Sequence, residues 1–394
     1  MISVEEALAQ CLALVAPLPV EHVPLAQSCG RYMPQPATAT RDQPPFAASA
    51  MDGYAVQGDP AAGDRFTVVG EAGAGHAWHG TLGPLQAARI FTGAPLPAGA
   101  TRVIIQEDVT RDGDVITLSA GADTGTHIRP AGQDFRAGDT LSARLLRPND
   151  LALLASMNVP LVPVTRRPVV AIIATGDELV MPGETPGPDQ IIASNSFTLK
   201  ALAEEAGAEV RLLPIARDTV EALSFVLGLA EGADIIVTTG GASVGDHDLV
   251  AQVAESLGLQ RAFWKIAMRP GKPLMAGRMG NAALLGLPGN PVSSVVCAHL
   301  FLLPMIRAAL GLPAEAVSPP PRSALLAQDV GPTGPRAHYM RATLTQGEAL
   351  PLITPADRQD SSLLSVLSAA DALLIRPAGD GPRRAGERVS YLPL

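Results

Sequence analysis

The sequence predicts a multidomain protein of the α/β and β classes, and two features carry this prediction. From Pro168 onward, short apolar strands alternate with helices, which is typical of a parallel sheet covered on both faces. The flanking regions are instead rich in glycine, proline and short β-type runs. We therefore expect an N-terminal helix plus a β-rich region of two intertwined subdomains (1–166), a central three-layer α/β/α domain (167–313) and a small β-barrel-like C-terminal domain (314–394).

The first predicted element is an amphipathic helix over residues 2–16. Ser3 and Glu6 have the spacing of a capping box, and Pro17 ends the helix. The expected apolar stripe consists of Leu8, Cys11, Leu12 and Val15. Beyond it, runs such as FTVVGEAGAG and VITLSA predict short strands joined by many turns.

The central region begins with the strand PVVAIIA, followed by a helix over 194–206 that opens at Ser194 or Ser196 and closes at Gly207. The strand EVRLLPI and a helix over 219–231, with Asp218 as its N-cap, come next, and ADIIV forms the following strand. Right-handed crossovers place the loops after these strands along one edge of the sheet, where ligands of open α/β sheets bind. The Pro-rich VSPPPRS is a linker to the last domain.

Composition excludes several classes of function. The formal charge of −9 disfavours nonspecific binding to nucleic acid or anionic membranes, and 4% aromatic residues leave few stacking surfaces. Three separated cysteines form no CxxC pair, which fits a reducing cytoplasm rather than a zinc site or disulfides. The acidic start is no secretory signal, and the best apolar run, Val292–Leu303, is shorter than a membrane span.

The most informative segment is ADIIVTTGGASVGDHD, residues 233–248. An apolar strand runs into a predicted turn of Thr238, Thr239, Gly240 and Gly241, and a helix follows that ends near Gly258. Such a turn presents free N–H groups and a positive dipole end, and a cation would bridge a phosphate to Asp246 and Asp248. A structural βα turn with one aspartate as the helix cap explains the pattern equally well.

Further motifs lie at the same sheet edge. ATGDELV puts Asp177 and Glu178 after the first parallel strand, where paired carboxylates suit cation binding or acid/base work. GLPGNPVSSVV predicts a second helix N-terminus, with Pro291 at its first position and Ser293 and Ser294 in its first turn.

Cations gather in KIAMRPGKPL, where Lys265, Arg269 and Lys272 surround a Pro-Gly turn. Three cations on one loop of an acidic protein favour an oxyanion ligand, although a solvated basic loop remains the alternative. In the last domain, Arg341 with Ser361 and Ser362 could bind an anion, but such residues are more often ordinary surface positions.

The N-terminal region offers weaker candidates. Asp52 and Thr92 are as readily turn residues as ligand contacts, and Arg129 with Asp134 reads as a surface ion pair. No Ser-His-Asp order, histidine cluster or P-loop lysine stands out. From the residues alone, we expect a phosphorylated ligand handled with a divalent ion.

Taken together, these segments resemble the molybdopterin molybdenumtransferase family, which includes the E domain of gephyrin. The matching segments, in chain order, are SAMDGYAV, FTGAPLP, RPAGQD, ATGDEL, SNS, TTGGASVGDHD, KIAMRPGKP and GLPGNPVSS. The resemblance covers nearly the whole chain. The central module alone also resembles the adenylyltransferase of the preceding pathway step, and MDGYA with the C-terminal domain decides between them.

The resemblance implies that molybdate and adenylylated molybdopterin give molybdenum cofactor and AMP, with Mg²⁺ as cofactor. It also implies a cytoplasmic homodimer with a shared active site. The preceding adenylyltransferase and acceptor molybdoenzymes or their chaperones are possible further partners, and no nucleic acid or membrane is expected. The alternatives are another adenylyl- or pyrophosphate-handling enzyme with the same central module, and a non-catalytic scaffold.

Site residues follow from the matching motifs. The resemblance implies magnesium ligands at Asp218 and Asp248, and active-site roles for Asp52, Thr92, Asp134 and Glu178, the first three acting in trans. The residues expected to bind substrate are Arg129, Ser194, Asn195, Gly240, Gly241, Ser243, Gly245, Lys265, Arg269, Lys272, Pro288, Gly289, Asn290, Pro291, Ser293, Arg341, Ser361 and Ser362.

Three positions depart from the family pattern. Ala47-Ala48 stands where Asp-Asn is usual before MDGYA, which changes the hydrogen bonding expected around Asp52. Arg269 replaces a common lysine, so the charge is kept with a different geometry. Tyr339 replaces a usual phenylalanine.

Overall fold

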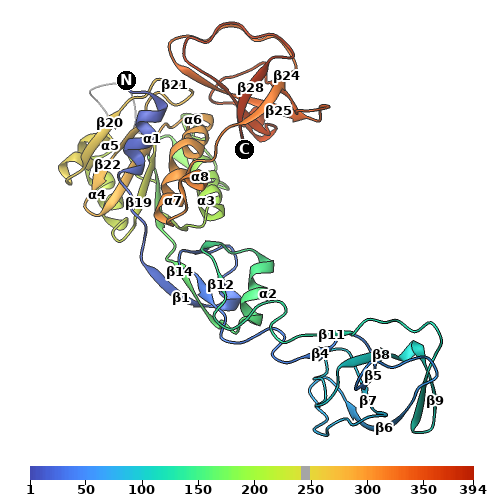
Figure 1. The fold of residues 1–394 in the computed structure, drawn as a ribbon. Coiled ribbons are helices and arrows are strands. Elements are labelled where there is room, and N and C mark those ends of the chain that lie inside the picture. The colour runs from blue at the N-terminus through green and yellow to red at the C-terminus, as the bar shows by residue number, and fades with distance from the viewer. Residues whose placement is uncertain (241–248) are drawn as a thin grey trace. The chain divides into compact units, whose positions relative to one another are not determined.

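The computed structural model describes residues 1–240 and 249–394, and the chain divides into two compact units (Figure 1). The first unit combines Met1–Glu21 with Thr165–Leu394, and the second unit is His22–Val164. The N-terminal helix therefore belongs to the same unit as the central sheet.

A six-stranded sheet forms the centre of the first unit, in the order β18-β15-β19-β23-β22-β20. Its strands are β15 (Val169–Ala174), β18 (Glu209–Leu212), β19 (Ile235–Thr239), β20 (Gln260–Trp264), β22 (Met275–Met279) and β23 (Ala282–Leu287). The first four strands in that order are parallel, as predicted, but β22 and β20 run antiparallel. Because only Gly280 and Asn281 separate β22 from β23, that pair must form a hairpin.

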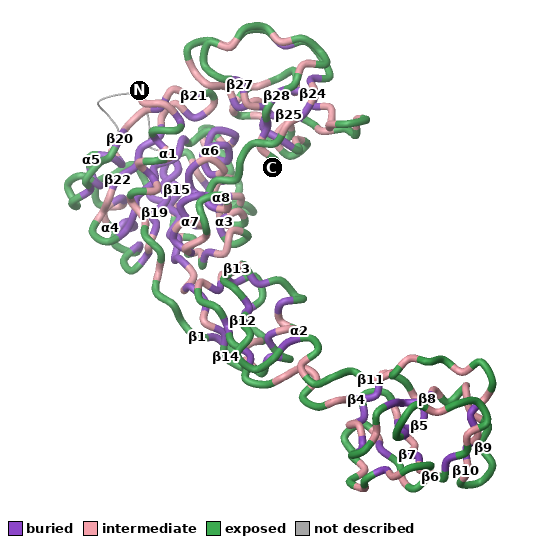
Figure 2. Tube along the Cα trace, in the orientation of Figure 1, coloured by how far each residue is buried: buried purple, intermediate pink, exposed green. Residues whose placement is uncertain are grey.

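Helices cover both faces of this sheet, which confirms the predicted three-layer architecture. Alternate residues of β15 point to opposite cores: Val170 and Ile172 pack with one face, Ala171 and Ile173 with the other. The first face carries α1 (Val4–Leu12), α3 (Asn195–Glu205), α6 (Pro291–Cys297) and α7 (Leu303–Ala309), and the second carries α4 (Val220–Leu229) and α5 (Leu249–Ser256). Figure 2 shows β15 and β19 as buried strands at the centre.

The structure confirms one predicted helix cap and contradicts another. The capping box of Ser3 and Glu6 is confirmed, but α1 ends at Leu12 and its buried face is Val4, Ala7 and Cys11, with Leu8 and Leu12 only partly buried. Asp218 as the N-cap of α4 is wrong. Thr219 takes that position, because its Oγ1 accepts the N–H of Ala222 at 3.2 Å. Similarly, Thr238 and Thr239 end strand β19 rather than forming the turn.

One continuous helical run among the described residues, Pro291–Ala309, has the length and hydropathy of a membrane span. It comprises α6, a π-helical segment (Ala298–Leu302) and α7, and so extends beyond the apolar run seen in the sequence. Within the structure 83% of the apolar window is buried, so its side chains form the core beneath the sheet.

The last part of the first unit is a closed β-barrel, as predicted. Its strands are β24 (Arg322–Leu326), β25 (Ala337–Thr345), β26 (Leu352–Pro355), β27 (Ala372–Arg376) and β28 (Arg388–Pro393). Pairing of β25 with β27 closes the barrel. The short β21 (Met268–Arg269), from the basic loop, pairs in parallel with the start of β25 and so joins the barrel sheet to the central domain.

The second unit is rich in β structure and has separate hydrophobic clusters. One sheet, in the order β8-β5-β7-β6-β10-β9, contains β5 (Gly53–Val56), β6 (Arg65–Ala72), β7 (Gln86–Ile90), β8 (Arg102–Ile105), β9 (Val109–Asp112) and β10 (Val115–Leu118). Another cluster uses residues before and after this sheet, from Val23–Ala39 and Phe135–Val164, with helix α2 (Pro148–Ser156). The chain thus leaves this cluster, builds the sheet and returns.

Candidate functional site

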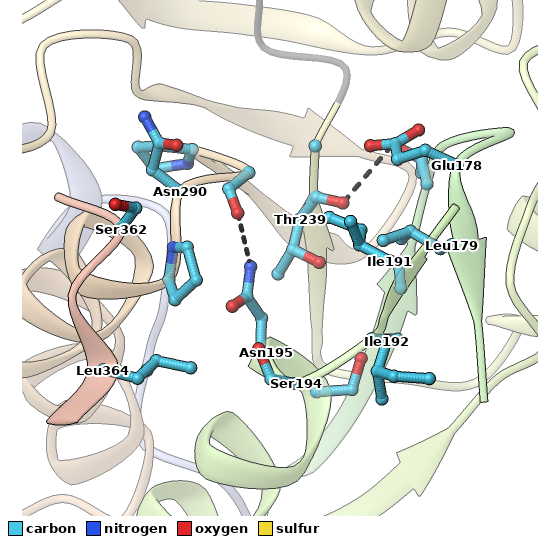
Figure 3. Close-up of a pocket in the computed structure, with 18 of the residues that line it drawn as sticks. Glu178, Leu179, Ile191, Ile192, Ser194, Asn195, Thr239, Asn290, Ser362 and Leu364 are labelled. Atoms are coloured by element: carbon cyan, nitrogen blue, oxygen red, sulfur yellow. Dashed lines mark hydrogen bonds between the residues drawn. The ribbon is translucent and has the colours of Figure 1, made fainter. Parts of the chain in front are cut away.

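A pocket of about 680 Å³ lies at the carboxyl ends of β15, β19 and β23 (Figure 3). Its residues follow directly on the three strands: Ala174 and Thr175, Thr239 and Gly240, and the Pro288–Pro291 turn. Parallel strands end at one edge of a sheet, so the fold brings these separate segments together. The start of α3 also contributes, and the remaining lining residues are Glu178, Leu179, Ile191, Ile192, Pro273, Ser362 and Leu364.

Of the predicted site residues, the pocket brings together Glu178, Ser194, Asn195, Gly240, Pro288, Gly289, Asn290, Pro291 and Ser362. Gly241, Ser243, Gly245 and Asp248 lie outside the described residues, as do Asp246 and His247. Thr175, Thr239, Ile191 and Ile192 also line the pocket and were missed as site residues. Thr175 and Thr239 could have been found, since each precedes the glycine that ends a predicted strand.

The floor of the pocket is a contact between two strand ends. The backbone N–H of Thr175 donates to the carbonyl of Thr239 at 2.9 Å, and the Thr175 hydroxyl donates to the same oxygen at 3.3 Å. Gly240 follows with φ +95°, and a Cβ on it would lie 2.4 Å from the Thr175 carbonyl oxygen. Only glycine fits this close approach, which places the backbone itself at the pocket surface.

Two helix N-termini lie at the same edge. Asn195, the first residue of α3, donates from Nδ2 to the carbonyl of Gly289 at 2.8 Å and so ties α3 to the turn before α6 (Figure 3). Pro291 begins α6, as predicted. The N–H of Val292, however, already donates to the carbonyl of Ser361 at 3.1 Å, so the C-terminal segment occupies one of this helix's free donors.

Carboxylates gather beside the pocket. Glu178 lines it, and the N–H of Asp218 donates to Asp177 Oδ1 at 3.2 Å. The pKa of Asp218 is raised, first by its partial burial and then by the negative charges of Asp177 and Glu178. Within residues 1–240 and 249–394, no three side chains of His, Cys, Asp or Glu form a ready metal site. The three acids nevertheless repel one another, which a cation would relieve.

The predicted cations do not line the pocket together. Lys265 lies over the ring of Trp264, with Nζ 4.6 Å from the centroid, and Arg269 lines a different cavity. Lys272 is half-buried, next to the pocket-lining Pro273. Ser293 is buried inside α6.

Arg341 is not a surface residue. Its side chain is 1% exposed, and its guanidinium donates to the carbonyls of Leu363 and Arg358, both at 3.2 Å. Gln359 bonds the Arg341 backbone in both directions at 3.0 Å. Burial lowers the pKa of this guanidinium. These bonds to Leu363 and Arg358 hold the segment between them, which carries Ser361 and Ser362, against β25.

In the second unit, Asp52 and Thr92 form a pair. Asp52 Oδ1 accepts both the backbone N–H and the hydroxyl of Thr92 at 2.7 Å. The pKa of Asp52 is lowered by these two bonds, and to a smaller degree by Arg89. The pair is local because Asp52 and Thr92 sit at the ends of the adjacent strands β5 and β7. Arg89, which donates to the carbonyl of Gly53 at 3.1 Å, was not predicted.

Arg129 and Asp134 are both exposed, and no ion pair within the described ranges joins them. The N–H of Asp134 donates to the carbonyl of Gln43 at 2.9 Å, and Arg129 lies on β11 (Ile128–Arg129) beside Ala48. The predicted surface ion pair is therefore wrong. Both side chains are free to meet a ligand.

Comparison with known proteins accounts for most of the chain. Residues 2–158 match the MoeA N-terminal region (domain I and II), residues 171–308 a probable molybdopterin binding domain, and residues 323–394 the MoeA C-terminal region (domain IV). The three matched regions follow one another along the chain in the same order as the predicted N-terminal, central and C-terminal domains.

Relatives that align over most of their length carry the name of the same family. The chain is 36% identical to molybdopterin molybdenumtransferase 2 of Mycobacterium tuberculosis over 336 residues, 82% of each chain. It is 35% identical to molybdopterin molybdenumtransferase of Nostoc over 387 residues, 95% of this chain and 88% of the relative. A solved molybdopterin biosynthesis MoeA protein from Pyrococcus superposes with a TM-score of 0.84 at 30% identity, over 99% of this chain and 98% of that one. The chain therefore belongs to the molybdopterin molybdenumtransferase family.

Proposed function

We propose that this protein consumes molybdate and adenylylated molybdopterin and releases molybdenum cofactor and AMP. One observation carries the proposal: three strand ends and the segment with Ser362 and Leu364 line a single pocket. Its lining combines glycine, proline, asparagine, hydroxyl groups and the carboxylate of Glu178 with apolar side chains such as Ile191 and Ile192. At about 680 Å³ its volume falls in the range of small-molecule sites. Exposed backbone at a sheet edge with two helix starts suits a pyrophosphate.

The residues have distinct roles in this proposal. The backbone of Gly240 and the Pro288–Pro291 turn approach the phosphates, and Asn195 holds that turn through Gly289. Glu178 is the carboxylate at the pocket wall and is placed to hold or accept a proton. Lys272, next to the pocket-lining Pro273, and Ser362 in the lining supply a cation and a hydroxyl for the oxygens of molybdate or of the pterin phosphate.

A magnesium ion fits the acidic side of the pocket. The pKa of Asp218 is raised first by its partial burial and then by the negative charges of Asp177 and Glu178, so a bound cation would favour its ionised form. Hard oxygen ligands of this kind suit Mg²⁺. We assign Asp218 as a ligand, with Asp248 as the second. Bound Mg²⁺ would supply charge neutralisation at the pyrophosphate as its P–O–P bond is cleaved.

We further propose a cytoplasmic homodimer in which Asp52, Thr92 and Asp134 of one subunit, with Arg129, complete the site of the other. The two hydrogen bonds from Thr92 to Asp52 Oδ1 support this role, because they hold a hydroxyl and a carboxylate together on one exposed face. The preceding adenylyltransferase and the acceptor molybdoenzymes are the expected exchange partners.

The decisive experiment measures AMP release from adenylylated molybdopterin, with and without molybdate. The proposal predicts release that requires both molybdate and a divalent ion. Release without molybdate would indicate a general pyrophosphate-handling enzyme. Tight binding of the adenylylated pterin without any turnover would indicate a scaffold.

A further inference from the structure

Arg89 lies between the two strand ends that carry Asp52 and Thr92. It belongs to β7, and the register of β5 with β7 places it directly beside Tyr54. Asp52 comes immediately before β5, and β7 leads through Phe91 to Thr92. The side chain of Arg89 therefore starts close to both members of the pair, although no sequence motif pointed to it.

The guanidinium of Arg89 packs on two aromatic rings. Its Cζ lies 5.0 Å from the centroid of the Tyr54 ring and 4.7 Å from that of Phe91. Tyr54 is buried and Phe91 is half-buried, so both rings are held by their surroundings. A guanidinium over aromatic faces is attracted by their negative π surfaces. Arg89 is thus fixed against one ring from each of the two strand ends.

The same guanidinium holds the backbone at Asp52. Its Nη1 donates to the carbonyl of Gly53 at 3.1 Å, and its Nη2 donates to Oε1 of Gln106 at 2.6 Å. The N–H of Gln106 in turn donates to the carbonyl of Asp52 at 3.0 Å. Nε2 of Gln106 donates to Glu107 Oε1 at 3.1 Å, which turns the amide oxygen toward Arg89. Two successive carbonyls, those of Asp52 and Gly53, are therefore held by one network.

The charge of Arg89 also favours the ionised form of Asp52. Within the described ranges no ion pair joins Arg89 to a carboxylate, so its charge is not neutralised by direct contact. The pKa of Asp52 is lowered first by the two bonds from Thr92 and then, to a smaller degree, by Arg89. Only an ionised carboxylate accepts both Thr92 bonds without a proton of its own to place.

We propose that Arg89 is the positioning residue of the Asp52–Thr92 pair. It fixes the backbone that carries Asp52 and packs against the ring next to Thr92, so the carboxylate and the hydroxyl keep one geometry. The inference rests on the proposed function only where it gives this pair a part in the reaction. Lysine cannot replace Arg89, because an ammonium lacks the planar fork that binds two acceptors while it lies on aromatic faces.

The test follows the backbone amide of Thr92 across pH in the full chain labelled with ¹⁵N-threonine, and Thr92→Ser assigns the signal. Since this amide donates to Asp52 Oδ1 at 2.7 Å, its shift reports the ionisation of Asp52. Arg89→Gln should raise the pH midpoint of the signal and lower kcat for AMP release roughly tenfold or more. Arg65→Gln removes the same charge from an exposed position on β6 and should change neither.

Arg89→Lys separates geometry from charge. If Arg89 positions the pair, lysine should restore neither the midpoint nor kcat, because the Thr92 bonds remain loosened. Full recovery of both by lysine would overturn the proposal, and so would a midpoint in Arg89→Gln equal to that in Arg65→Gln.

Gln106→Leu provides a second route if Arg89→Gln does not fold. It removes the acceptor of Nη2 and leaves both rings in place, so it should raise the midpoint by a smaller amount. An unchanged midpoint in this variant would count against the network. The amide titration needs no substrate, so a failure of the proposed reaction would be seen separately, as absent turnover in the unsubstituted protein.

Discussion

Gly240→Ala tests whether close backbone packing builds the reaction pocket. Gly240 has φ +95°, and an added Cβ would lie 2.4 Å from the Thr175 carbonyl oxygen and 2.9 Å from its hydroxyl. Gly258 is a matched control, because its φ is +97° and a Cβ there meets nothing within 4 Å. The two alanine variants therefore share the conformational strain and differ in the steric clash.

The magnitudes follow from these two contributions. The left-handed conformation costs an alanine about 1–2 kcal/mol at either position. Overpacking against a backbone carbonyl adds roughly 1–3 kcal/mol at Gly240 alone. For a unit of this size the difference corresponds to roughly 2–12 °C in the thermal midpoint of the first unit.

Calorimetry of the unsubstituted protein and of the two alanine variants measures this difference in thermal midpoint. Titration of each with adenylylated molybdopterin measures the effect on binding. We expect Gly240→Ala to melt below Gly258→Ala and to bind the pterin more weakly, because the Thr175 and Thr239 segments must separate. If the two variants melt together and bind alike, the reasoning about close approach is refuted.

The remaining predictions concern individual side chains. Asn195→Ala removes the bond to Gly289 and should raise KM for the pterin about fivefold, whereas Asn281→Ala at the opposite sheet edge should not; equal KM values would contradict the role of Asn195. Thr92→Val should raise the pKa of Asp52 toward its ordinary value, as seen by NMR. A carboxyl pKa that is lower in the folded than in the unfolded protein stabilises the folded state above the unfolded pKa, and this stabilisation is lost as pH falls through the folded pKa. The variant should therefore lose stability at neutral pH relative to acid pH. An unchanged dependence of stability on pH would count against the Asp52–Thr92 pair. Asp218→Asn should abolish divalent-dependent turnover. With chelator present, the same variant should raise the thermal midpoint at neutral pH, because a raised folded-state pKa means that the folded protein disfavours the charged carboxylate above that pKa. An unchanged midpoint would contradict the unfavourable environment assigned to this carboxylate.

Local patterns account for the parts of the site that were predictable. Gly240 and the Pro288–Pro291 turn follow buried apolar runs, and turn chemistry after a parallel strand points to the ligand-binding edge. The pocket edge could therefore be predicted without any contact information. Capping preferences were less decisive, since both Asp218 and Thr219 are acceptable N-caps and only the hydrogen bond to Ala222 distinguishes them.

Long-range packing accounts for what could not be predicted. The burial of Arg341 depends on residues 358–363 folding back over β25, which no periodicity in that strand reveals. Arg269 likewise reaches its cavity because β21 pairs with β25, a segment far along the chain. A cation in a loop looks the same in sequence whether it faces solvent, a backbone carbonyl or a ligand.

We propose above all that the pterin binds at the carboxyl ends of β15, β19 and β23. Hydrogen–deuterium exchange of the full chain, with and without adenylylated molybdopterin and with molybdate withheld, tests this most directly. We predict protection in residues 191–196 and 287–292, at the starts of α3 and α6. Protection confined to residues 228–236 and 279–282, at the opposite edge of the sheet, would contradict it.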